Sequence, residues 1–429
     1  MGRAMFLRRP IVLGASRSGL AALGLLLIAT PAPAIDDSWI RFGPAGDGPS
    51  SAGVVDREFV REWEKNPPLG YPTLSPANIP ATKDAIKRYE EIVKAGGWET
   101  VPNVKMFYGE THFAVAVLKR RLVASGDLKD DDGNEVFTAD LEAAVKRFQA
   151  TNGLTPTGIV DERTAVALNV PADARLRQLR NSLSRIQALA ATAAKRRYVV
   201  VNIPAAQVEA VEGDKVVSRH TAVVGKPDRP TPVLTTTIHE MNFNPVWRLP
   251  PTVITKDLIP RGREMQAAGQ NVLVKFGIDA YDGAGKKVDP GTINWSSGQP
   301  HGLSYRQQPG KDNPLGFLKI NFANSHSVYM HDTPSESIFG RNFRAASSGC
   351  IRVAQIETLA AWLLRGNEGW DRDRIAAVKA SGERVDVKVK KPVPLYFVYV
   401  TAWATPDGVI QFRRDLYDRD RAGADASSY

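Results

Sequence analysis

Residues 329–334 read Tyr-Met-His-Asp-Thr-Pro, and residues 347–353 read Ser-Ser-Gly-Cys-Ile-Arg-Val. The second stretch contains Cys350, the one cysteine in 429 residues, and the first contains His331. A lone cysteine is most often a small buried apolar residue. A cysteine nucleophile instead needs a base that takes its proton and amide dipoles that hold the developing oxyanion. A histidine at a strand end and a Gly-Cys turn after small residues can supply both, so the pattern predicts a catalytic cysteine.

The residues before the cysteine predict a strand over 318–331 that leads into the site. Side chains alternate across a strand, so Tyr329 and His331 should share one face while Met330 points away. We expect His331 to be the general base, or the imidazolium partner of a preformed Cys350 thiolate. Tyr329 is then placed to contact the substrate or the oxyanion. Asp332 lies on the opposite face, so a backbone carbonyl is the expected group that orients His331.

The loop around the cysteine supplies the remaining candidates. His326, in a predicted turn at 324–327, is the alternative base. The backbone N–H groups of Ser348, Gly349 and Cys350 are the expected oxyanion donors, and glycine permits the necessary turn. Arg352 is placed to meet a substrate carboxylate or to fix the turn. No His/Asp/Glu cluster in the sequence has the spacing of metal ligands, so we predict no metal site.

Length and composition predict a globular protein of two or three domains. Apolar residues make up 43% and charged residues 24% of the chain, and the formal net charge is +10. The first 34 residues contain four arginines and no acidic residue, so the rest of the chain carries +6, which is +10 less those four charges. This mild positive balance suits an acidic polymer. No basic motif interleaved with aromatic residues indicates nucleic acid.

The N-terminus predicts a signal peptide. Arg8 and Arg9 form a basic region, residues 20–28 an apolar region, and Ala-Pro-Ala at 32–34 a cleavage site. The apolar run is too short to span a bilayer comfortably, although an uncleaved anchor is the alternative. The Sec and Tat export routes both stay open. A single cysteine cannot form an intrachain disulfide in an oxidising compartment, which strengthens the catalytic reading of Cys350.

Helical spacing dominates the first half of the chain, and β-branched runs begin at about residue 198. Thr138 and Asp161 are expected to cap two helices of a compact three-helix module. We divide the chain into a signal peptide (1–34), a flexible lead-in and helical scaffold (35–110), the helical module (111–170), a connecting helix (171–195), a catalytic domain (196–400) with an inserted lid at about 242–313, and C-terminal strands with a tail (401–429).

The motifs around His331 and Cys350 resemble the active-site signature of the L,D-transpeptidases, the YkuD-type cysteine enzymes that cross-link peptidoglycan. Residues 244–247, 306–310, 313–316 and 399–403 are similar to the larger, periplasmic branch of that family, and residues 144–169 resemble a peptidoglycan-binding domain. Many relatives carry histidine two residues before the cysteine. This chain has Ser348 there, which the larger branch tolerates.

The resemblance implies a multidomain α+β protein: a mixed β-sheet or β-sandwich catalytic domain with a lid, a small three-helix peptidoglycan-binding domain and a helical scaffold. It implies that Cys350 attacks the peptide bond after the third stem residue, normally diaminopimelate, and expels D-alanine. The thioester then passes to an amine of a neighbouring stem, which forms a 3-3 cross-link. No cofactor is expected, and carbapenems should acylate the cysteine slowly. Trp247, on the lid, either covers a peptide stem or packs in the core.

The implied location is the periplasm, with membrane contact only during export and peptidoglycan stem peptides as partners. Three alternatives stay open. Water as the acceptor would make the protein an L,D-carboxypeptidase, and the N-terminus of an outer-membrane protein would make it an anchoring enzyme. A wall-binding protein without catalysis is the alternative from another class, and an intact Cys350 and His331 argue against it.

Overall fold

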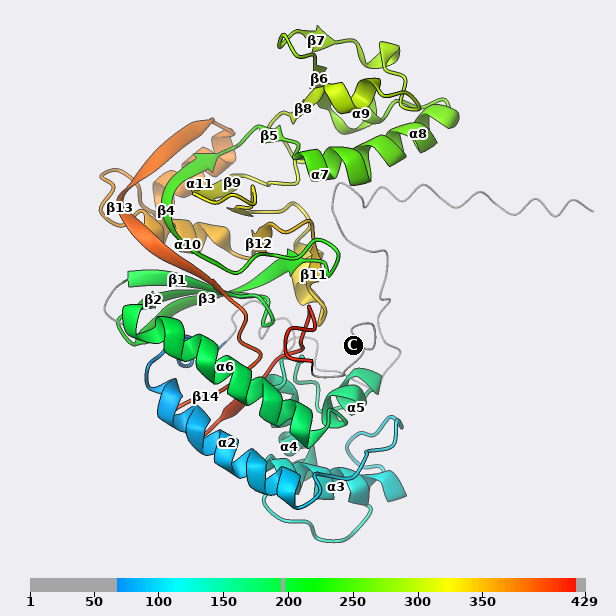
Figure 1. The fold of residues 1–429 in the computed structure, drawn as a ribbon, viewed down its shortest axis with the longest axis vertical. Coiled ribbons are helices and arrows are strands. Elements are labelled where there is room, and N and C mark those ends of the chain that lie inside the picture. Colours follow the sequence, from blue (N-terminus) through cyan, green and yellow to red (C-terminus); the bar gives the residue numbers. More distant parts are fainter. Residues whose placement is uncertain (1–67, 194–196, 422–429) are drawn as a thin grey trace, which may run out of the picture. The chain divides into compact units, whose positions relative to one another are not determined.

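The computed structural model describes residues 68–193 and 197–421 (Figure 1). The predicted signal peptide and most of the predicted lead-in therefore lie outside the described residues. The described chain is a mixed α+β structure, as the sequence predicted. None of its described helices is both long enough and apolar enough to cross a membrane.

A nine-stranded mixed sheet, with the order β11-β3-β12-β10-β9-β4-β13-β1-β2, forms the centre of the part that follows residue 196. Because β2 also pairs with β3, the sheet closes on itself into a barrel-like layer. Its strands are β1 (Arg197–Asn202), β2 (Gln207–Glu212), β3 (Lys215–Gly225), β4 (Leu234–Phe243), β9 (Leu318–Phe322), β10 (Met330–His331), β11 (Ala345–Ser347), β12 (Ile351–Val353) and β13 (Val385–Val398).

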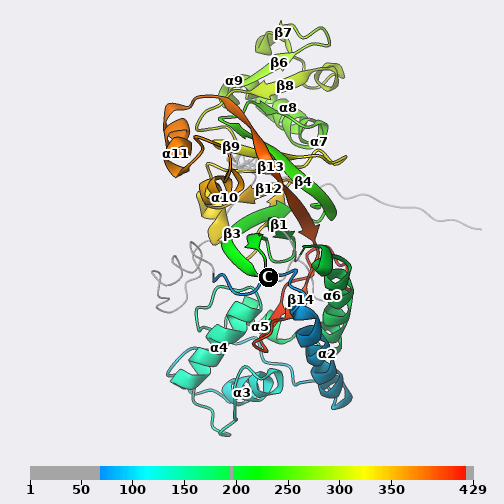
Figure 2. The same cartoon turned by 90° about the vertical axis from the view of Figure 1, so that its left-hand side faces the viewer.

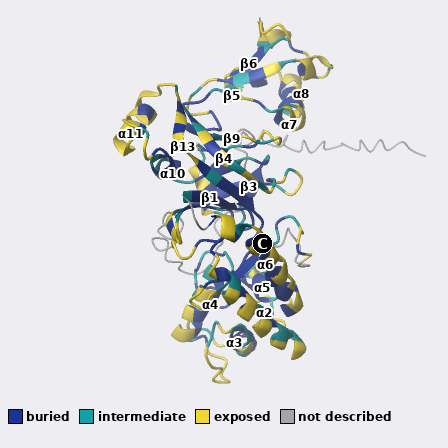
Figure 3. Cartoon of the chain, turned by 60° about the vertical axis from the view of Figure 1, so that its left-hand side comes forward, coloured by how far each residue is buried: buried dark blue, intermediate teal, exposed yellow. Residues whose placement is uncertain are grey.

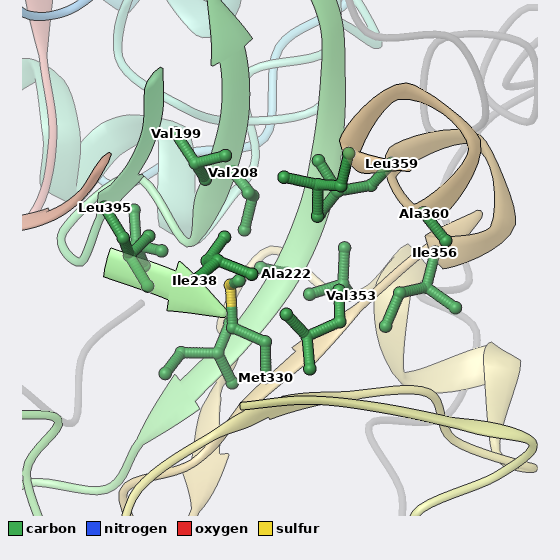
Figure 4. Close-up of a cluster of buried hydrophobic side chains, with 14 of the residues drawn as sticks. Val199, Val208, Ala222, Ile238, Met330, Val353, Ile356, Leu359, Ala360 and Leu395 are labelled. Atoms are coloured by element: carbon green, nitrogen blue, oxygen red, sulfur yellow. The ribbon is translucent and has the colours of Figure 1, made fainter. Parts of the chain in front are cut away.

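The largest apolar core lies against this sheet, and the runs of β-branched residues explain it because alternate side chains of each strand enter one interior. Figure 4 shows Ile238, Met330 and Val353, from three strands, in one cluster of buried side chains with Ile356, Leu359 and Ala360 of α10 (Ile356–Leu363). Helix α11 (Arg372–Ser381) adds Ile375 and Val378 to the same core. Burying each large apolar side chain contributes about 1.5–3 kcal/mol, so this core fixes the strand register.

Two long helices, α2 (Asn78–Lys94) and α6 (Ala172–Ala193), pack side by side (Figures 1 and 2). Helix α6 packs Ile186 and Ala190 against Tyr198 and Val200 of β1, and α2 packs against α6 and the hairpin of β14 (Ala402–Ala404) and β15 (Ile410–Phe412). Figure 3 shows that their surfaces divide into buried and exposed stripes. The amphipathic pattern of residues 172–193 therefore reflects packing between the sheet and α2.

Three helices form the module at 111–170: α3 (Phe113–Ser125), α4 (Ala139–Thr151) and α5 (Glu162–Leu168). The predicted caps are confirmed. Thr138 accepts a hydrogen bond from the N–H of Leu141 (3.3 Å), and Asp161 accepts one from Thr164 (2.8 Å). These contacts satisfy donors that a helix start leaves free. The helices bury a separate apolar core, which explains how the module keeps its shape.

The inserted lid has its own small sheet, with the order β5-β8-β6-β7, and its own apolar core. Its elements are β5 (Trp247–Arg248), α7 (Pro251–Val253), a π-helical turn (Ile254–Leu258), α8 (Ile259–Ala267), α9 (Val272–Phe276), β6 (Ile278–Tyr281), β7 (Lys287–Val288) and β8 (Ser304–Gln307). Gly262 of α8 packs against Trp295 so closely that an added Cβ would lie 2.2 Å from the indole. Only glycine fits there.

Two predictions differ from the structure. Residues 318–331 form a hairpin, β9 and β10, because the Asn324 side chain accepts hydrogen bonds from the N–H groups of His326 (3.0 Å) and Val328 (3.1 Å) and closes a turn. The sequence also predicted a flexible lead-in, and this prediction is wrong for the part of the lead-in that the structure describes, from residue 68 on. Leu74 is fully buried, and Thr73 hydrogen-bonds the Glu209 carboxylate through its N–H (2.9 Å) and its hydroxyl (2.7 Å).

This packing predicts the effect of truncating Leu74. Leu74→Ala should lower the free energy of unfolding by about 2–5 kcal/mol, because it leaves a cavity in the core under α6. Leu69→Ala is the matched control, since Leu69 is 48% exposed and its truncation should change stability by less than about 0.5 kcal/mol. Urea unfolding measures both. Equal losses would contradict the packing of this segment.

Candidate active site

Three basic side chains lie in one row across the sheet. His331 of β10 pairs with Lys319 of β9 on one side and with Arg352 of β12 on the other. Directly paired residues project to the same face, so the three side chains stand next to one another. The alternate residues Met330, Ile320 and Ile351 project to the opposite face and are fully buried in the apolar core.

The loop before β12 holds the cysteine beside this row. Gly349 has φ of +108°, a conformation that strongly favours glycine. Its N–H donates to Ser347 Oγ (3.1 Å), and that hydroxyl donates to the carbonyl of Cys350 (2.6 Å). The Gly349 amide predicted as an oxyanion donor is thus used inside the loop. The amides of Ser348 and Cys350 make no hydrogen bond to the described chain and remain as donors.

A cavity of about 250 Å³ opens onto Cys350. The catalytic side contributes Tyr329, His331 and Arg352, and the lid contributes Trp247 and residues 250–253. His326 and Ser348 also line this cavity. The structure therefore brings every predicted site side chain to one place, although these residues come from separate parts of the sequence.

The Cys350 thiol is hydrogen-bonded to Tyr329. Burial raises the pKa of the thiol, whereas the backbone and hydroxyl of Tyr329, followed by Lys319 and Arg352, lower it. Trp247 Nε1–H in turn donates to the Tyr329 hydroxyl (3.1 Å). The Tyr329 hydroxyl therefore accepts a hydrogen bond from Trp247 and donates one to the Cys350 sulfur. Burial and the nearby cysteine raise the pKa of Tyr329, so its hydroxyl keeps its proton and can donate it.

His331 is a neutral imidazole at physiological pH. Its Nδ1–H donates to the backbone carbonyl of Asp332 (2.5 Å), which confirms that a carbonyl orients the ring. Burial, and then the charge of Arg352, lower its pKa to about 3. The Tyr329 and His331 rings lie 5.6 Å apart, as their predicted shared face requires. His331 and Cys350 both lie in the described part of the chain, and their contacts there include no hydrogen bond from one to the other.

The other sequence candidates have these positions. Asp332 turns away, and its carboxylate accepts the N–H of Phe317 (3.0 Å). His326 is exposed in the hairpin turn at the cavity edge. Trp247 is 3% exposed and belongs to the apolar core of the lid, so it packs there and lines the cavity at once.

Sequence reasoning missed two basic residues. Lys319 lies 4.5 Å from the centre of the Tyr329 ring and acts on the Cys350 thiol, but strand register, which the sequence does not state, places it there. Arg229 donates to Ser348 Oγ (2.8 Å) and to both oxygens of Asp257 (2.6 and 2.9 Å) in the lid. This bidentate pair connects the lid to the cysteine loop.

No three His, Cys, Asp or Glu side chains within the described ranges cluster so that they could hold a metal ion.

Comparisons with known proteins find a similar family for each of two parts of the chain. Residues 196–387 match the family described as "L,D-transpeptidase catalytic domain", and residues 111–168 match the "Putative peptidoglycan binding domain" family. A curated relative from Haemophilus influenzae, named "Putative L,D-transpeptidase", is 32% identical over 224 residues. That alignment covers 52% of this chain and only 44% of the relative's length.

Two solved structures are also similar. One is an L,D-transpeptidase from Mycobacterium smegmatis, at 16% identity and a TM-score of 0.23, covering 47% of this chain and 58% of that one. The other is an L,D-transpeptidase from Stackebrandtia nassauensis, at 12% identity and a TM-score of 0.26, covering 70% and 97%. The similarity is thus to YkuD-type L,D-transpeptidase catalytic domains over residues 196–387 and to peptidoglycan-binding domains over residues 111–168, and the chain spans less than half the length of its curated relative.

The hydrogen bond from Tyr329 predicts the reactivity of the thiol. Because it stabilises the thiolate, Tyr329→Phe should raise the pKa of Cys350 and slow alkylation by iodoacetamide about tenfold at pH 8, with the loss shrinking as pH rises. Tyr305→Phe is the matched control, since its hydroxyl donates to the Pro300 carbonyl (3.0 Å) within the lid. The chain has one cysteine, so intact mass reports the site directly. Unchanged alkylation in Tyr329→Phe would contradict this role.

Proposed function

We propose that the protein is a periplasmic peptidoglycan L,D-transpeptidase with Cys350 as the nucleophile. One observation carries this proposal: Cys350 and His331 line one cavity, beside the buried Arg352 and the partly buried Lys319. A cavity lined by a thiol, a neutral imidazole and the Arg352 cation, with Lys319 next to His331 in the sheet, suits acyl transfer from a peptide that carries carboxylates.

The first half of the reaction is acylation. His331 takes the Sγ proton as the thiolate attacks the carbonyl carbon of the bond after the third stem residue. Lys319 and Arg352 favour the thiolate because both lower the pKa of Cys350. The amides of Ser348 and Cys350, with the Tyr329 hydroxyl, are the donors for the oxyanion. The imidazolium then gives its proton to the leaving amine, D-alanine departs, and a thioester remains.

The second half transfers the acyl group. An amine of a neighbouring stem gives its proton to His331 and attacks the thioester carbon. The carbon–sulfur bond breaks, the thiolate recovers the proton, and a 3-3 cross-link forms. Trp247 and residues 250–253 form one wall of the cavity, and exclusion of water by a bound acceptor stem against this wall would favour an amine over hydrolysis.

Export and wall binding complete the proposal. The predicted signal peptide at 1–34 would deliver the chain to the periplasm, and the module at 111–170 would bind peptidoglycan. Carbapenems, whose strained amide a thiolate can open, should acylate Cys350. Water or the N-terminus of an outer-membrane protein would be a different acceptor for the same thioester.

Product analysis tests the reaction. The mature enzyme is incubated with purified disaccharide-tetrapeptide, and the products are separated and weighed by mass spectrometry. We expect a dimer that lacks one D-alanine, and none with Cys350→Ala. Tripeptide monomer alone would replace the transpeptidase proposal by a carboxypeptidase or a protein-anchoring enzyme. Unchanged substrate would favour a wall-binding protein without catalysis.

The base is tested by a matched pair of histidine variants. His331→Gln should lower the rate of dimer formation at least about 100-fold, the size of general base catalysis. His326→Gln should stay within about twofold of the wild type, because His326 is exposed at the cavity edge. The same assay measures both rates. The reverse order would make His326 the base.

A further inference from the structure

A second cavity, of about 150 Å³, lies away from Cys350 where the helical module meets the catalytic sheet. Its described walls include the last two residues of α4 and residues 153–155 after it, strands β2 and β3, the loop at 339–344, and the end of β15. A water molecule in the liquid occupies about 30 Å³, so this space admits a carboxylate group together with its neighbouring atoms.

Three arginines line this cavity: Arg219, Arg344 and Arg413. Backbone carbonyls hold each guanidinium in place. Arg413 donates to the carbonyl of Thr151 in the module (2.9 Å), Arg344 to that of Ala205 (3.3 Å), and Arg219 to that of Tyr71 (3.0 Å). The positive charges are therefore fixed by the fold before any ligand arrives.

Their mutual repulsion is only partly balanced. The pKa of Arg413 falls to about 9, first because of burial and then because of Arg219 and Arg344 beside it. Glu209 is the acid that opposes this effect, and it already binds Arg219 (3.1 Å) and Thr73. No aspartate or glutamate is among the described residues that line the cavity. The acid that acts on Arg413 is thus already hydrogen-bonded to other groups, and the cavity lining itself carries three guanidinium groups.

Neutral donors complete the lining. Asn342 accepts hydrogen bonds at Oδ1 from the N–H (3.0 Å) and hydroxyl (2.9 Å) of Thr155, so its NH₂ group stays available to a ligand. Gln207 of β2 and Gln411 of β15 add two more amide side chains. Guanidinium and amide groups are hydrogen-bond donors, and no carboxylate is among the described residues of the lining. Such a set of donors forms a site for an oxyanion such as a carboxylate or phosphate.

We propose that this cavity binds a carboxylate group of the stem peptides of peptidoglycan, apart from the stem that reacts at Cys350. The choice of ligand rests on the proposed function, since the wall is the carboxylate-bearing polymer that such an enzyme meets. A bound carboxylate would contact the loop at 339–344 through the Asn342 amide, which Thr155 of the module orients, and the sheet through Arg219. It would hold the catalytic domain on the wall while the lid cavity exchanges substrates.

Retention on purified sacculi tests this site in a Cys350→Ala background, which prevents turnover. Arg344→Gln removes one charge, and the near-isosteric Gln207→Glu places an acid among the arginines while leaving all three in place. Each should weaken retention about tenfold, as loss of a charge-assisted contact does. Arg372→Gln, at an exposed position of α11, is the matched control for net charge and should change retention less than twofold. Thermal unfolding checks that every variant is folded.

The ligand is identified with two probes. On sacculi whose carboxylates have been amidated, the wild type and Arg344→Gln should bind equally. If the wild type still bound amidated sacculi more tightly than Arg344→Gln, the assignment of a carboxylate as the ligand would be overturned. Inorganic phosphate that binds the cavity without displacing sacculi would assign it to a free anion and overturn the wall assignment. Equal retention of Gln207→Glu and Arg372→Gln would also overturn it. Dimer formation with soluble tetrapeptide, in the same variants with Cys350 restored, reports the proposed function separately.

Discussion

The pairing of β10 with β9 and β12 is the constraint on which the site depends. It places Lys319, His331 and Arg352 side by side on one face, and it sends Ile320, Met330 and Ile351 into the core on the other. A shift of one residue would exchange the two faces. The apolar core that stabilises the sheet therefore also holds the basic row in place.

Burial and charge act in opposite directions within this row. Removing a cation from water is unfavourable, and burial lowers the pKa of Arg352 to about 10 and of His331 to about 3. The same cations lower the pKa of the thiol that burial raises. A neutral imidazole beside a thiol can accept its proton, whereas an imidazolium cannot. The site thus combines a neutral imidazole, which its low pKa makes a weak base, with charges that favour the thiolate.

The sequence predicted the parts of the site that depend on local pattern. Strand alternation placed Tyr329 with His331, and the turn geometry required Gly349. The carbonyl that orients His331 was expected because Asp332 lies on the opposite face. Helix caps at Thr138 and Asp161 were also local signals. The roles of these side chains in catalysis remain predictions.

Contacts between segments that are distant in the sequence could not be predicted from local sequence patterns. Lys319 reaches the site only through register, and Arg229 joins Ser348 to Asp257 across segments separated by about a hundred residues. Leu74 was assigned to a flexible segment because glycine and proline surround it, yet α6 and the sheet bury it. The sequence predicted one strand over residues 318–331, because β-propensity does not reveal a turn. In the structure the Asn324 side chain closes a turn within this stretch.

The central claim is that the thiol beside this basic row carries the acyl group. Intact-protein mass spectrometry of the enzyme, quenched in acid during turnover of disaccharide-tetrapeptide, tests it most directly. We predict a mass increase equal to the donor minus D-alanine, located on Cys350 by peptide mapping and absent in Cys350→Ala. Turnover without a covalent adduct, or an adduct on another residue, would contradict the account.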